Sequence, residues 1–166
     1  MAERKVLVDG VNLKYEGLFN FKDLYNILDS WLSENSYDKR EHENLEKVTP
    51  TGKFIRIELR PWRTSSDYEK VEMKIVLTVH DMVDVVVEKD GMKMKLNKGS
   101  VSIVFSGFLL TDVEGRWTSK AFFFFLSQVF DKFIYKTQLG RLEATLKHDV
   151  MMLHKTLKSF LNMHRY

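Results

Sequence analysis

Cysteine is absent from the 166 residues, and the chain contains only two prolines. Without cysteine there is no disulfide framework, no thiol nucleophile, and no thiolate site for zinc or an iron–sulfur cluster. A fold of this kind must be stabilised by its apolar core. We therefore predict a reducing, cytoplasmic setting for the protein.

Long apolar runs are also missing. The longest unbroken run covers residues 121–126, whereas a helix needs about 20 apolar residues to cross a bilayer. Near the N-terminus only Val6, Leu7 and Val8 precede the dipeptide Asp9-Gly10, which is too short for the core of a signal peptide. The sequence predicts neither a transmembrane segment nor export.

Glycines are few, eight in all, and they are scattered. Phosphate-binding loops need closely spaced glycines between a strand and a helix, and a serine nucleophile needs a sharp glycine-flanked turn. Neither pattern occurs. His148 and His154 are six residues apart, about 240° around a helix, so they cannot face one metal ion together. We predict no catalytic residue, no metal site and no cofactor.

The composition that remains is that of a soluble globular domain, with 44% hydrophobic and 30% charged residues. The formal net charge is +3, and the basic excess lies in the C-terminal half. This charge is small beside the dense basic face of a dedicated duplex-binding protein. Aromatic residues make up 13% of the chain, mainly through 12 phenylalanines, and supply ample apolar area for a core.

The middle of the chain alternates with a period of two. Apolar and polar residues alternate over 55–59 and 71–79, which is typical of strands with one buried face. Asp9-Gly10, Asp90-Gly91 and 97–99 carry turn residues and predict hairpins. These links are too short for parallel crossovers, so we expect an antiparallel meander of about seven or eight strands.

Helical spacing occurs on both sides of this meander. From Phe21 the apolar positions follow a period near 3.6, with Asn20 as a cap, and the pattern ends at Asn35. A second helical segment runs from Thr118 towards Met163, and we expect a break between Tyr135 and Gly140 because glycine lowers helix propensity. The prediction is a single α+β domain over 1–166, with the C-terminal segment packed on the sheet.

This order of elements resembles the helix-grip folds, the START and Bet v 1-like proteins. The resemblance implies an apolar ligand held between the sheet and the C-terminal helix. Two segments, Phe160-Leu161-Asn162-Met163-His164-Arg165-Tyr166 and Phe130-Asp131-Lys132-Phe133-Ile134-Tyr135, are also similar to uncharacterised small archaeal proteins. That second resemblance implies no function.

The C-terminal segment is unusually apolar on several sides, with four consecutive phenylalanines at 122–125. Such a surface fits a packed core, a homodimer interface, the lining of a cavity, or a contact with a membrane surface. The residues that carry these alternatives are Phe122, Phe125, Val129, Phe133, Leu146 and Leu153. The leading hypothesis is a non-catalytic interaction module whose partner is a second copy or an apolar small molecule.

A second hypothesis uses a cluster of arginines around an indole: Arg56, Arg60, Trp62 and Arg63. Guanidinium groups beside an exposed aromatic ring bind phosphates and stack on unpaired bases. The cluster therefore predicts weak binding to RNA or single-stranded nucleic acid, unless the arginines pair with nearby glutamates and the indole closes the core. A third hypothesis is an enzyme with a cavity between sheet and helix.

Overall fold

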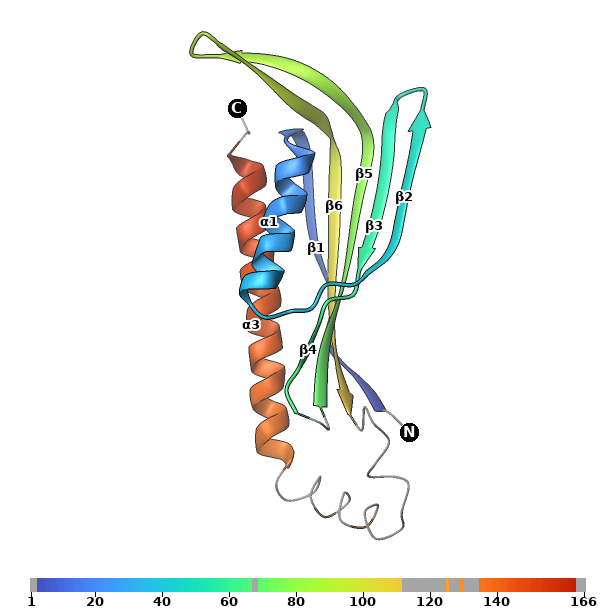
Figure 1. Cartoon of the computed structure of the whole chain (residues 1–166), viewed down its shortest axis with the longest axis vertical. Coiled ribbons are helices and arrows are strands. Elements are labelled where there is room, and N and C mark those ends of the chain that lie inside the picture. Colours follow the sequence, from blue (N-terminus) through green and yellow to red (C-terminus); the bar gives the residue numbers. More distant parts are fainter. Residues whose placement is uncertain (1–2, 67–68, 112–124, 126–128, 130–134, 164–166) are drawn as a thin grey trace.

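A computed structural model of the chain describes residues 3–66, 69–111, 125, 129 and 135–163, and shows an antiparallel sheet with two helices on one face (Figure 1). The elements in chain order are β1 (Glu3–Phe19), α1 (Phe21–Glu34), β2 (Glu41–Thr49), β3 (Gly52–Leu59), β4 (Trp62–Thr64), β5 (Glu69–Lys89), β6 (Met92–Thr111) and α3 (Tyr135–Asn162). The predicted α+β fold, with the C-terminal helix packed on an antiparallel sheet, is confirmed.

The sheet has the strand order β1-β6-β5-β3-β2, and the short β4 pairs with β5 beyond the end of β3. The first strand therefore pairs with the last one, in a register that runs from Glu3 opposite Thr111 to Phe19 opposite Asn97. This arrangement leaves β1 and β2 at the two edges of the sheet. Pro61 lies in the gap between β3 and β4, as expected for a residue that interrupts a ladder.

The sheet has six strands rather than seven or eight, because two predicted turns are not turns. Asp9-Gly10 forms a bulge within β1, with register shifts between Val6 and Val11 and a positive φ of 63° at Gly10. The 97–99 segment continues within β6 without a turn and pairs with the end of β1. A residue that tolerates positive φ serves a bulge as well as a hairpin, and the pairing partner decides between them.

Helix α1 forms as predicted, because its signals are local. The side-chain oxygen of Asn20 accepts a hydrogen bond from the Asp23 amide at 3.1 Å, which caps the first turn. Leu24, Leu28 and Leu32 form its buried stripe. Asn35 is the C-terminal cap residue.

Helix α3 is continuous from Tyr135 to Asn162, so the break predicted between Tyr135 and Gly140 is wrong. Gly140 is exposed, and a single glycine costs a helix only about 1 kcal/mol. Five buried leucine and valine side chains outweigh this cost over a helix about 42 Å long: Leu146, Val150, Leu153, Leu157 and Leu161. Most of the predicted helix before Tyr135 lies outside the described residues.

The core lies between the helices and one face of the sheet. Alternate residues of β5 and β6 are buried there, and the residues between them line the other face, which no described element covers. Gly107 in β6 lets α3 approach closely, since a Cβ atom added there would lie 2.8 Å from Cδ2 of Leu146. In Figure 1, α1 and α3 lie side by side, and the far end of the β5–β6 hairpin bends over them.

Candidate functional site

The predicted arginine cluster is divided by the sheet, because alternate residues of a strand face opposite sides. Arg56 lies on the uncovered face, where its guanidinium contacts Glu43 at 2.5 Å and lies 3.9 Å from Glu58. Arg60 donates to Glu58 at 2.9 Å. Burial of Glu58 acts to raise its pKa, but the Arg60 hydrogen bond and the surrounding positive charges outweigh burial and lower it. Both arginines are therefore neutralised locally.

The other two members of the cluster lie apart. The Lys70 ammonium lies over the Trp62 ring, 4.7 Å from the ring centroid, in a cation–π contact. Arg63 points to the helix side of the sheet and donates to Asp149 of α3 at 3.2 Å. Arg56, Arg60 and Arg63 thus each have a carboxylate partner, which leaves less positive charge for an anionic ligand.

Arg63, which is half-buried, contacts the buried Tyr37 and Asp149, and we call these three residues the Asp149 cluster. The Tyr37 hydroxyl donates to Asp149 Oδ2 at 2.7 Å, and the Arg63 guanidinium lies 4.6 Å above the Tyr37 ring. Arg63 also donates to the carbonyl of Asn35 at 3.1 Å. Burial, and then the Asp149 hydrogen bond, raise the pKa of Tyr37 well above its ordinary value. The cluster joins α3, β4 and the end of α1, and its hydrogen bonds stabilise the packing of these elements.

The apolar candidates are also divided. Leu146 and Leu153 are fully buried in the core, which agrees with the core alternative for these two residues. Phe125 and Val129 are 64% and 42% exposed. Phe122 and Phe133 lie outside the described residues. Of the four side chains that the structure describes, two are therefore in the core and two are exposed, so these four do not form one surface.

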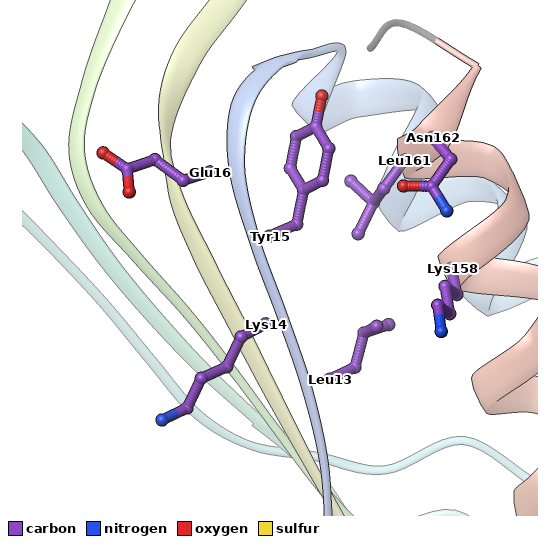
Figure 2. A pocket seen from close by; sticks show the side chains of 7 residues that line it. All are labelled: Leu13, Lys14, Tyr15, Glu16, Lys158, Leu161 and Asn162. Atoms are coloured by element: carbon purple, nitrogen blue, oxygen red, sulfur yellow. The ribbon is translucent and has the colours of Figure 1, made fainter.

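A pocket of about 180 Å³ lies at the edge of the sheet, between β1 and the last turns of α3. We call it the β1–α3 groove, and it is lined by Leu13, Lys14, Tyr15, Glu16, Lys158, Leu161 and Asn162. Figure 2 shows Leu13 and Tyr15 pointing towards α3, and Lys14 and Glu16 pointing away from it. The groove therefore runs along the open edge of a strand.

One side of the β1 backbone at this groove pairs with no strand among the described residues. Antiparallel strands alternate between residues that bond their neighbour and residues whose N–H and C=O point the other way. Asn12 belongs to the outward set, because its carbonyl lies 3.1 Å from His154 Nε2, and so does Leu18, whose carbonyl accepts from the Tyr15 hydroxyl at 2.6 Å. Lys14 and Glu16 lie between them in the same alternation.

The outward N–H and C=O groups of Lys14 and Glu16 have no partner in the part of the chain that the structure describes. Their side chains are exposed and form no ion pair there. Four backbone groups and two opposite charges are thus presented along one short stretch of edge. This combination is a ready template for another strand.

Sequence reasoning missed these residues for a specific reason. The alternation over 12–16 predicts a strand, but whether that strand is central or at an edge depends on the strand order, which the sequence does not reveal. The opposite charges of Lys14 and Glu16, two residues apart, were the available signal. Tyr37 and Asp149 were missed because 112 positions separate them along the chain.

In the described residues, no group of three histidine or acidic side chains is placed to hold a metal ion. No helix in that part of the chain is long and apolar enough to span a membrane. No family model matches the chain, and the search of curated proteins found no similar sequence. Function must therefore be argued from the geometry alone.

Proposed function

We propose that this protein is a non-catalytic interaction module that binds an extended polypeptide along the open edge of β1, in the β1–α3 groove. The observation that supports the proposal is the row of unpaired backbone groups at Lys14 and Glu16. An added strand satisfies such groups with main-chain hydrogen bonds, and the adjoining groove selects its side chains.

The packing beneath the described part of α3 supports a surface site more than a site enclosed between that helix and the sheet. The side chains of α3 that face the sheet are fully buried against it, as Leu146, Val150 and Leu153 show. The β1–α3 groove, by contrast, is an open pocket of about 180 Å³ at the edge of the sheet. Three other functions stay predictions from the sequence: an apolar ligand between sheet and helix, nucleic-acid binding and an enzymatic activity. Nucleic-acid binding has less support, because the arginines are paired with carboxylates.

Glu16→Pro tests the proposal directly. Proline removes one outward N–H, and the β1–β6 ladder is preserved because that N–H does not bond β6. Extended peptides would be selected from a displayed random library against the wild-type protein, and their affinities measured by fluorescence anisotropy. We expect about a tenfold loss of affinity for Glu16→Pro, the size of one lost hydrogen bond.

Glu16→Ala is the matched control, since it removes the carboxylate and keeps the N–H. It should retain most of the affinity. Selected peptides that bind the proline variant as well as the wild type would place the binding surface elsewhere on the molecule. Failure to select any peptide, together with no self-association through β1, would overturn the proposal.

A further inference from the structure

We propose that the strand which occupies this edge is β1 of a second copy of the chain, paired antiparallel about a two-fold axis at Tyr15. This inference rests on the proposed function and names its partner. The pairing would join two six-stranded sheets into one continuous sheet.

The unpaired backbone groups fit this register. With Tyr15 opposite its own copy, Lys14 lies opposite Glu16 of the second chain, and Glu16 opposite Lys14. Both residues present outward N–H and C=O groups, so each facing pair exchanges two hydrogen bonds and the seam contains four. The neighbouring outward carbonyls, of Asn12 and Leu18, already have partners within the chain. The free stretch therefore has the length that this pairing uses.

Charge complementarity selects the same register. Lys14 and Glu16 lie on the face of the sheet away from α3, so each Lys14 would lie directly beside a Glu16 of the other copy (Figure 2). Opposite charges in directly facing positions stabilise an antiparallel pair, and like charges destabilise it. Moving the axis by one residue would place Lys14 opposite Lys14, or Glu16 opposite Glu16.

An edge lysine commonly prevents strands from pairing, because it brings a charge to the seam. Here Glu16 compensates that charge in the one register described above. Met151 adds an exposed apolar side chain beside the groove. It is 53% exposed, and around the axis of α3 it lies within about 20° of Lys158, which lines the groove. An exposed apolar side chain thus continues the line of the groove along the helix.

Charge reversal with rescue tests the register. With Lys14→Glu, each of the two facing pairs would consist of two glutamates, and with Glu16→Lys each would consist of two lysines. Each single variant should raise the dimer dissociation constant about tenfold or more, from two attractive pairs made repulsive. The double variant Lys14→Glu/Glu16→Lys restores opposite charges and should return the constant to within about threefold of the wild type.

The measurement is sedimentation velocity over a concentration series, with circular dichroism to confirm folding. Lys47→Glu changes an exposed lysine on β2, at the opposite edge, and should leave the constant unchanged. A monomeric wild type, or a double variant no better than the singles, would overturn the self-pairing. If the monomer still binds selected peptides and Glu16→Pro abolishes that binding, the proposed function stands without it.

A cross-link provides an independent readout if a charge variant fails to fold. The chain has no cysteine, so Lys14→Cys mixed with Glu16→Cys introduces one thiol per chain. Facing residues of a hydrogen-bonded pair have Cα atoms about 5.5 Å apart, which a disulfide can bridge. Under glutathione disulfide the mixture should form a covalent dimer. Either variant alone should not, because its two thiols are offset by two residues, and cross-linking equally in all three samples would contradict the register.

Discussion

The Asp149 carboxylate connects helix α3 to two other parts of the fold. It is 8% exposed, it accepts from Tyr37 and Arg63, and these contacts connect α3 to β4 and to the segment after α1. A buried carboxylate is stable only while its partners remain in place, and removing one member of such a pair leaves another polar group unpaired. The Asp149 cluster is therefore a site where small changes have large effects.

We predict that Asp149→Ala lowers the free energy of unfolding by about 2 to 4 kcal/mol, because Tyr37 and Arg63 lose their shared acceptor. Urea unfolding followed by tryptophan fluorescence measures the change. Glu143→Ala on the same helix is the matched control, since Glu143 pairs with Lys147 on the surface. That variant should unfold at the same urea concentration as the wild type, and equal losses in both would show that the cluster contributes no more than a surface pair.

Tyr37 makes stability depend on pH in the alkaline range. Its pKa in the folded protein is raised above the ordinary value by burial and by Asp149, so the folded state keeps a proton that the unfolded chain releases above about pH 10. The stabilisation is complete below that pH and is lost as pH rises further. We expect the unfolding free energy to fall more steeply above pH 10 in the wild type than in Tyr37→Phe.

The comparison separates Tyr37 from the other five tyrosines, which both proteins share. Urea unfolding at intervals between pH 8 and 11 provides the two curves. The difference in slope should approach, at most, about 1.4 kcal/mol per pH unit. Parallel curves would show that the Tyr37 hydroxyl titrates alike in the folded and unfolded chains.

Helix α3 and strand β6 are matched in shape at Gly107. We predict that Gly107→Ala destabilises the protein by about 1 to 3 kcal/mol, since the new methyl group would overlap the fully buried side chain of Leu146. Leu146→Ala should cost about 2 to 5 kcal/mol through the cavity it leaves. The double variant should cost less than the sum, because the new methyl group occupies part of that cavity. Additive losses in urea unfolding would show that the two sites do not interact.

The elements differ in how far the sequence predicts them. Helix α1 has its cap, its apolar stripe and its end within 16 residues, and all were predicted. The bulge at Asp9-Gly10 and the continuation of β6 through 97–99 were not, because each is paired with a strand more than 75 positions away. The candidate edge site was missed for the same reason. Local patterns specify elements, and long-range pairing decides which edge is open.

At the scale of the whole molecule, the sheet is asymmetric. One face is covered by α1 and α3, and the other carries charged side chains, of which Arg56 and Lys74 are half-buried and Glu58 is buried. The two edges differ as well, since β2 is short and mostly exposed, whereas β1 is long and borders a helix. The β1 edge is thus the one where an added strand gains side-chain contacts as well as hydrogen bonds.

The pairing of β1 with β6 also has a consequence for biosynthesis. Residues near Glu3 leave the ribosome roughly a hundred residues before their partners near Thr111. During that interval β1 has no neighbour on either side, and non-local strand pairing of this kind folds slowly. The nascent chain must therefore keep β1 unpaired until the sheet is almost fully translated. An unpaired strand is prone to aggregation, so we expect chaperones to bind β1 during synthesis.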